Sequence, residues 1–91
     1  MYYRYYTKQF QKSLNKIISS GKIKRREVED VVDVLSRGHS LSREYKDHSL
    51  NGELSKYREC HIQSDLLLIY KIKKENLILI LVDIGSHSQL F

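Results

Sequence analysis

The chain has 91 residues, of which 41% are hydrophobic and 30% are charged, with four glycines and no proline. This length allows one hydrophobic core and the composition argues against a disordered tail, so we expect a single ordered domain over residues 1–91. The longest apolar runs, 66–70 and 77–82, are too short to cross a bilayer as helices, and residues 1–6 lack the apolar run of a signal peptide. A soluble protein with no membrane partner is expected.

The net charge of +5 is distributed unevenly along the chain. Residues 1–26 contain eight lysines and arginines and no acidic residue, whereas residues 27–91 contain eight basic and eleven acidic residues. Such a basic segment favours encounter with a polyanion such as RNA, or with an acidic protein. Cys60 is the single cysteine and cannot form an internal disulfide, which predicts a reducing compartment such as the bacterial cytoplasm.

The first half of the chain predicts one strand and two helices. An aromatic run at 2–6 is typical of a strand. Thr7 is suited to cap a first helix and Gly21 to end it, and its apolar stripe consists of Phe10, Leu14, Ile17 and Ile18. A second helix is closed by Gly38, with an apolar stripe of Val28, Val31, Val32 and Leu35. The two helices should form an antiparallel hairpin.

The second half predicts a loop and then a sheet. Residues 39–51 are irregular and polar, and the runs 54–62, 66–73 and 77–84 have strand character with short polar connectors at 63–65 and 74–76. We expect an antiparallel meander, followed by a tail at 85–91 that can fold back through Leu90 and Phe91. The expected architecture is α+β with the order β-α-α-β-β-β, a helical hairpin packed on a small, mostly antiparallel sheet.

Four titratable residues follow or precede predicted strands: His48, His61, Asp65 and His87. Imidazole titrates near neutral pH, so several histidines in one cleft can divide proton donation and acceptance between them. Strand direction decides whether the four residues meet. The alternative for each is a solvated surface residue, which is what we expect of His39.

Lys46 and Arg58 are close in sequence to these histidines. Either residue can hold a scissile phosphate and stabilise the charge of its transition state. The alternative is ordinary surface solvation, or for Arg58 a salt bridge to Glu59 or Asp65. Phe91 can stack on a base or serve as a hydrophobic anchor.

Metal and cofactor chemistry have little support in the sequence. Structural zinc sites need close pairs such as Cys-x2-Cys or His-x3-His, and the chain contains neither, so we predict no metal and no cofactor. Cys60 is next to His61, but adjacent residues of a strand point to opposite faces, which favours a core position for Cys60. Gly85 is not part of a phosphate-binding loop pattern.

Four ordered motifs give the chain a family resemblance over nearly its full length. They are Lys-Asp-His-Ser-Leu-Asn-Gly at 46–52, Tyr-Arg-Glu-Cys-His-Ile at 57–62, Asp65 with Leu-Leu-Ile-Tyr-Lys at 67–71, and Gly-Ser-His-Ser-Gln-Leu-Phe at 85–91. This pattern closely resembles the YafQ-like branch of the RelE/ParE toxin superfamily, whose members share the β-α-α-β-β-β order.

The resemblance implies a toxin of a bacterial type II toxin–antitoxin system, an endoribonuclease that enters the ribosomal A site and cuts messenger RNA without a metal. The ribose 2′-OH attacks the adjacent phosphate, so DNA should resist. The implied site contains His48, His61, Asp65, His87 and Phe91. In it His87 is the general acid, His48 or Asp65 is the general base, and His61 lies near the phosphate with Lys46 or Arg58.

The implied partners are a RelB- or DinJ-like antitoxin, mRNA on the 70S ribosome, and operator DNA through the antitoxin complex.

Two positions depart from the family pattern: Asp83 replaces an arginine of many relatives, and Leu66 replaces a tryptophan of some. An anion near the phosphate would weaken catalysis if it faces the cleft. The alternative function is therefore a toxin that binds an antitoxin, gyrase or the ribosome without catalysis.

Overall fold

Five strands form one mixed sheet in the order β1-β5-β4-β3-β2. The computed structural model describes residues 1–63 and 65–91, and Ser64 in the connector predicted at 63–65 lies outside the described residues. The strands are β1 (Tyr3–Tyr6), β2 (His48–Ser49), β3 (Arg58–Gln63), β4 (Leu66–Lys73) and β5 (Ile78–Gly85). The helices are α1 (Lys8–Ser19), α2 (Arg25–Ser36) and α3 (His87–Leu90), with short 3-10 turns η1 (Arg43–Tyr45), η2 (Gly52–Leu54) and η3 (Lys74–Asn76).

The two long helices begin and end where the sequence predicts. Thr7 caps α1 by accepting a hydrogen bond from the Phe10 amide at 3.1 Å. After each helix the chain turns at a glycine in the left-handed region, Gly21 at φ +80° and Gly38 at φ +79°, where glycine has no steric penalty. None of the described helices is long and apolar enough to cross a membrane.

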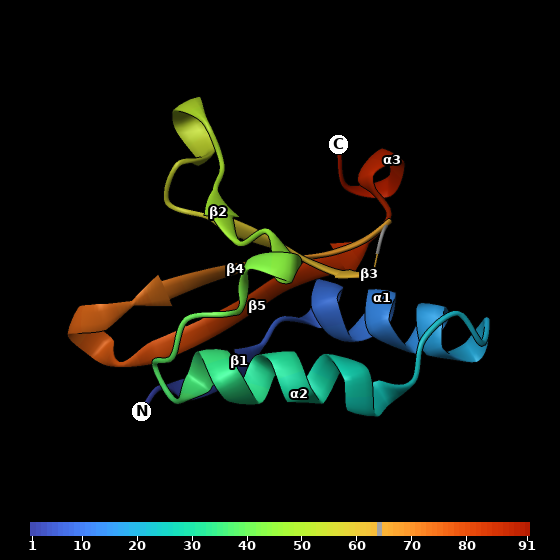
Figure 1. Cartoon of the computed structure of the whole chain (residues 1–91), viewed down its shortest axis with the longest axis horizontal. Coiled ribbons are helices and arrows are strands. Elements are labelled where there is room, and N and C mark those ends of the chain that lie inside the picture. Colours follow the sequence, from blue (N-terminus) through green and yellow to red (C-terminus); the bar gives the residue numbers. More distant parts are fainter. Residues whose placement is uncertain (64) are drawn as a thin grey trace.

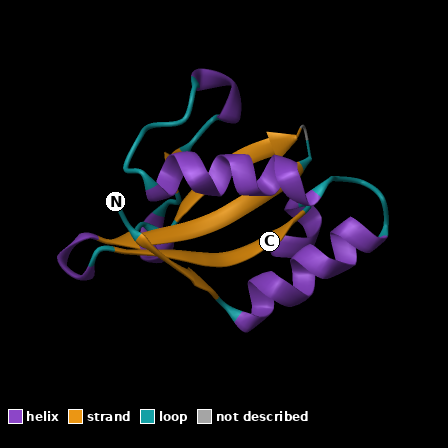
Figure 2. Ribbon diagram, turned by 90° about the horizontal axis from the view of Figure 1, so that it is seen from below, coloured by secondary structure: helices purple, strands orange, loops and turns teal. Residues whose placement is uncertain are grey.

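The core lies between the sheet and the pair α1 and α2, which cover one face of the sheet (Figures 1 and 2). We call this the inner face. It buries Phe10 and Leu14 of α1 and the predicted valine and leucine stripe of α2 against Cys60, Leu66, Leu68, Tyr70, Leu79, Leu81 and Ile84. Removal of these apolar side chains from water is the main force that holds the helices on the sheet.

The opposite, outer face of the sheet carries α3 and the loop that contains η2, which rise on the same side of the sheet in Figure 1. Side chains of β4 alternate between the two faces, so Leu67 and Ile69 point outward. Both are nevertheless buried, with 1% and 7% of their surface exposed. The central strand is therefore covered on both faces, as its continuous apolar run predicts.

The predicted α+β fold is confirmed, with four differences in detail. The strand predicted at 54–62 begins only at Arg58, because residues 52–54 form η2. The loop at 39–51 contains the short strand β2, and the tail forms the helix α3, in which Leu90 is half-buried and Phe91 is 54% exposed. β1 pairs with β5 in parallel, which makes the sheet mixed, while the other pairs are antiparallel.

Candidate functional site

The alternation of side chains along β3 separates two groups of charged residues. Cys60 packs in the core, so Arg58 also points to the inner face, while Glu59 and His61 point to the outer face. The register places His48 of β2 directly opposite Glu59. Two histidines and one carboxylate thereby share the outer face.

Glu59 lies between the two imidazoles. One of its carboxylate oxygens, Oε1, is 3.5 Å from Nε2 of His61 and 3.9 Å from Nε2 of His48. Glu59 is only 6% exposed, and a buried carboxylate is costly unless a charged or hydrogen-bonding partner compensates it. We call these three residues the outer cluster.

A backbone contact fixes which nitrogen of His48 can exchange a proton. Nδ1 of His48 lies 2.6 Å from the carbonyl oxygen of Lys46. A carbonyl oxygen only accepts hydrogen bonds, so we assign the proton to Nδ1. Nε2, which faces Glu59, is then the nitrogen that takes up or releases a proton. Lys46 adopts the left-handed conformation, φ 49°, at the turn that leads into β2.

A second group surrounds the start of α3. The backbone N–H of His87 donates to Oδ1 of Asp65 at 3.4 Å, and the ring of His87 lies 5.3 Å from the ring of Phe91 between centroids. Ser86 begins the helix with a capping box, in which its amide donates to Oε1 of Gln89 at 2.8 Å. The carboxylate of Asp65 thus ties the connector before β4 to the C-terminal helix.

The sheet register brings the second group to the same end of the sheet as His61. His61 pairs with Leu67, and Leu67 pairs with Gly85, so the three residues form one row across β3, β4 and β5. α3 starts two residues after Gly85 and lies on the outer side of the sheet (Figure 1). Of the residues predicted from the sequence, His48 and His61 therefore lie on the outer face, and α3 carries His87 on the same side. Asp65 lies at the end of the sheet, in contact with the start of α3.

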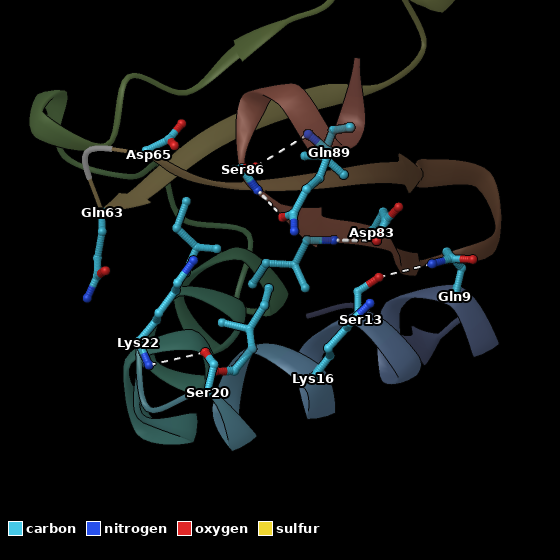
Figure 3. A pocket seen from close by; sticks show the side chains of 14 residues that line it. Gln9, Ser13, Lys16, Ser20, Lys22, Gln63, Asp65, Asp83, Ser86 and Gln89 are labelled. Atoms are coloured by element: carbon cyan, nitrogen blue, oxygen red, sulfur yellow. Dashed lines mark hydrogen bonds between the residues drawn. The ribbon is translucent and has the colours of Figure 1, made fainter.

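A groove of about 610 Å³ runs between α1 and the end of the sheet, next to α3 (Figure 3). Its lining includes Lys16 and Ser13 from α1, Asp65, and Asp83 from β5. The carboxylate of Asp83 accepts a hydrogen bond from the neighbouring Ile84 amide at 2.8 Å. Asp83 therefore shares this groove with Asp65, and Lys16 lines it from α1.

Arg58 is on the inner face, in a network with Asp47 and Tyr70. Nη2 of Arg58 is 3.1 Å from Oδ2 of Asp47, and the Tyr70 hydroxyl donates to Oδ1 of the same carboxylate at 2.5 Å. The hydrogen bond to Asp47 raises the pKa of Arg58, while burial, followed by the bond to Asp47, raises the pKa of Tyr70. We call these three residues the inner network. Its salt bridge differs from both pairs anticipated for Arg58, which were Glu59 and Asp65.

Cys60 and Leu66 belong to the core. Cys60 is fully buried, and burial raises the pKa of its thiol to about 12. A thiol that stays protonated at neutral pH is a poor nucleophile, so the predicted core position of Cys60 is confirmed. Leu66, where some relatives carry tryptophan, points to the inner face and is 8% exposed.

Sequence reasoning missed Glu59 as a member of the site. The signal was present, because residues 59 and 61 are two apart on a predicted strand and so share a face. The position of His48 opposite Glu59 had no local signal, since it depends on the pairing of β2 with β3. Among residues 1–63 and 65–91, no three His, Cys, Asp or Glu side chains are arranged to hold a metal ion.

Comparison with known proteins gives consistent matches. A family model described as "Bacterial toxin of type II toxin-antitoxin system, YafQ" matches residues 2–91. The mRNA interferase toxin YafQ of Escherichia coli strain K12 is 40% identical over 47 residues, which cover 52% of this chain and 49% of that protein. The aligned segments span 30% and 49% of the lengths of the curated relatives.

Two solved structures match over essentially their whole length. A metal-bound toxin from Helicobacter pylori is 43% identical, with a TM-score of 0.90 and coverage of 100% of both chains. A chain of the E. coli DinJ-YafQ complex is 26% identical, with a TM-score of 0.86 and coverage of 100% of this chain and 99% of that chain. The fold is thus shared with solved toxin structures over the whole chain.

Proposed function

Because the chain belongs to the YafQ family of bacterial toxins of type II toxin–antitoxin systems, we propose that it is a ribosome-dependent mRNA endonuclease. The observation that carries this proposal is the outer cluster, in which one buried carboxylate faces two imidazoles on the side of the sheet that also bears His87 and Phe91. A related protein is named mRNA interferase toxin, which supports the same activity.

The proposed reaction is transesterification at an RNA phosphate. The ribose 2′-OH loses its proton to a base and attacks the adjacent phosphorus, and the 5′ oxygen of the next nucleotide leaves as it takes a proton from an acid. The products are a 2′,3′-cyclic phosphate and a 5′-OH. These steps use proton transfer alone, which suits groups that titrate near neutral pH.

We assign the base to Nε2 of His48 and the acid to His87. The Nδ1 proton of His48 is held by the Lys46 carbonyl, so Nε2 is available to accept a proton, and Glu59 then stabilises the imidazolium that forms. His87 is at the start of α3, where Asp65 accepts a hydrogen bond from its backbone amide. In this scheme Asp65 positions His87 and is not the base.

We assign phosphate binding to His61 and Lys46 and base stacking to Phe91. His61 is the other imidazole against Glu59, and Lys46 directly precedes the stretch that bears His48. We do not assign phosphate binding to Arg58, because its guanidinium is paired with Asp47 on the inner face. Phe91 is 54% exposed beside the ring of His87, which suits stacking on a base next to the cleaved bond.

The proposed partners are translating 70S ribosomes and a DinJ-like antitoxin. Solved structures of the E. coli DinJ-YafQ complex contain chains of this fold, which supports an antitoxin partner. We propose that the antitoxin's acidic segment covers the basic surface and that its other half binds operator DNA. A toxin that acts on ribosomes would work in the cytoplasm.

The test is cleavage of a defined message in a reconstituted translation system, with mapping of the new 5′ ends. Wild-type protein should produce fragments with 5′-OH ends only while the message is translated. His87→Ala should lower the rate by about a hundredfold to ten-thousandfold, as expected for loss of a general acid. A message with a 2′-deoxy residue at the cleaved position should resist.

Three results would contradict the proposal in different ways. Full cleavage by His87→Ala would remove the assignment of the acid while leaving the activity. Intact messages together with DNA damage after induction of the wild type in cells would favour the alternative, a toxin that poisons gyrase by binding. A protein that arrests translation without any cleavage would favour binding to the ribosome alone.

A further inference from the structure

Tyrosines and lysines form a regular array on the outer face, beside the outer cluster. Tyr3 and Tyr5 of β1 pair with Ile78 and Ile80 of β5, and these isoleucines pair with Lys73 and Lys71 of β4. The array therefore has two rows, Tyr3-Ile78-Lys73 and Tyr5-Ile80-Lys71. Strand geometry separates the rows by about 7 Å and each tyrosine from its lysine by about 10 Å.

The aromatic rings in this array are accessible. Tyr3 is 75% exposed and Tyr5 is 59% exposed, while the isoleucines between the strands are half-buried. The inward side chains of β1 are engaged instead, since Arg4 pairs with Glu29 and Asp33 of α2. Two neighbouring tyrosines that stand out from a sheet offer flat surfaces on which successive bases can stack.

The lysines give the array a positive edge. Neither Lys71 nor Lys73 forms a salt bridge within residues 1–63 and 65–91. The Lys71 ammonium lies 5.5 Å from the ring centroid of Tyr57, a cation–π contact that restrains it near β3. Two lysines without a salt-bridge partner are suited to bind the phosphate backbone of a nucleic acid.

The array is continuous with the site. The row after Tyr5-Ile80-Lys71 on the outer face contains Ile69 of β4 and, paired with it, Glu59 of β3. A single-stranded RNA on the array thus reaches the outer cluster from Lys71 after about 7 Å along β4 and about 5 Å across to β3. Within the described part of the chain, no helix lies over the outer face at the end of the sheet where η3 joins β4 to β5 (Figure 1).

We propose that this array binds single-stranded RNA next to the cleavage site, with bases stacked on Tyr3 and Tyr5 and phosphates held by Lys71 and Lys73. The proposal rests on the proposed function, since it assigns a further binding surface for the same substrate. It extends the site from the nucleotides at the cleaved bond to those that flank it.

The experiment measures affinity for a fluorescein-labelled, single-stranded RNA of about twelve nucleotides, fully 2′-O-methylated so that it cannot be cut, by fluorescence anisotropy. The double variant Tyr3→Ala/Tyr5→Ala should raise Kd about tenfold or more through lost stacking. The conservative pair Tyr3→Phe/Tyr5→Phe keeps both rings and should stay within about twofold of wild type.

The lysines are tested by the salt dependence of the same binding. Lys71→Gln/Lys73→Gln should reduce the slope of log K against log salt by about 1.4, the value expected for two phosphate contacts on a single strand. The matched control, Lys8→Gln/Lys12→Gln, removes the same charge from exposed positions of α1 and should reduce the slope by less. Thermal unfolding verifies that all variants are folded.

Three outcomes would overturn the inference. Unchanged Kd in the tyrosine-to-alanine pair would exclude stacking, and equal slope losses in the two lysine pairs would indicate a general charge effect. Loss of antitoxin binding with unchanged RNA affinity would make the array a protein-docking surface. The proposed function is judged separately, because message cleavage on ribosomes by the wild type can succeed or fail whatever these Kd values are.

Discussion

The outer cluster and the inner network draw on neighbouring residues of the same two stretches, 47–48 and 58–61, to which the inner network adds Tyr70 of β4, but their contacts differ. In the inner network the charged and hydroxyl groups approach to 2.5–3.3 Å. In the outer cluster the Glu59 carboxylate stays 3.5 Å and 3.9 Å from the two imidazoles. One face of β3 therefore holds a closed network of hydrogen bonds, and the other holds a carboxylate that lies near two imidazoles without a close contact to either.

This difference separates a structural role from a chemical one. Close, mutually satisfied hydrogen bonds fix side chains and resist exchange of protons. An imidazole nitrogen without a close partner can still contact a substrate, and His48 and His61 are both partly open to solvent. Because side chains alternate along a strand, β3 can serve a structural role on the face next to the helices and a chemical role on the outer face.

The largest expected effect is on catalysis. His61→Ala should lower message cleavage by about a hundredfold to a thousandfold, because it removes an imidazole assigned to the phosphate. It should also lower stability, because the buried Glu59 loses its nearer partner. Arg58→Ala, a change on the opposite face of the same strand, should weaken folding but preserve cleavage per folded molecule. The measurement is the cleavage rate of each variant, corrected for the fraction of molecules that are folded. An Arg58→Ala protein that is folded and inactive would break the distinction between the two faces.

The next effect concerns stability at high pH. Burial raises the pKa of Cys60 from an ordinary value of 9.0 to about 12, so the folded chain keeps this proton where the unfolded chain releases it. Stability contributed by the neutral thiol is complete below about pH 9 and declines as the pH rises toward about 12, by on the order of 4 kcal/mol.

Cys60→Ala should flatten this decline, as measured by urea midpoints at several pH values between about 8 and 11. Tyr70→Phe serves as the comparison, because the raised pKa of Tyr70 adds a decline of the same sign that starts nearer pH 10. Equal pH slopes for wild type and Cys60→Ala would show that the thiol is not desolvated as its position indicates.

Much of the fold was predictable because its signals are local. The caps at Thr7 and Gly21, the apolar stripes of the helices and the continuous apolar run of β4 each follow from residues close in sequence. The parallel pairing of β1 with β5 had no such signal, since it joins residues more than seventy positions apart. The 3-10 turn at 52–54 interrupts a segment whose composition resembles a strand.

The candidate site was predictable only in part. The types and spacing of the histidines indicated acid–base chemistry, and the structure assigns them to one side of the sheet. Arg58 was expected near them but points the other way, because strand alternation couples its direction to that of Cys60 in the core. Membership of Glu59 could have been inferred from the same alternation, whereas its contact with His48 required knowledge of the β2–β3 register.

A third prediction sharpens the role of Glu59. Glu59→Gln keeps the shape but removes the charge that the two imidazoles share, so cleavage should fall by about a hundredfold, mainly in kcat, if the carboxylate positions them. Glu59→Asp retains the charge on a shorter side chain and should recover part of the rate. Single-turnover cleavage on ribosomes distinguishes a slower chemical step from weaker RNA binding. If Glu59→Gln unfolds more readily but cleaves normally, the carboxylate is structural.

The smallest expected effect tests the inner network. Asp47→Ala removes the acceptor of the Tyr70 hydroxyl and the partner of Arg58, and a buried donor left without an acceptor costs about 2 kcal/mol of folding free energy. Urea denaturation should report this loss. The double variant Asp47→Ala/Tyr70→Phe, which removes the orphaned hydroxyl as well, should recover part of it. Additive losses in this cycle would mean that Asp47 and Tyr70 are not coupled, and the inner face would then owe its order to apolar packing alone.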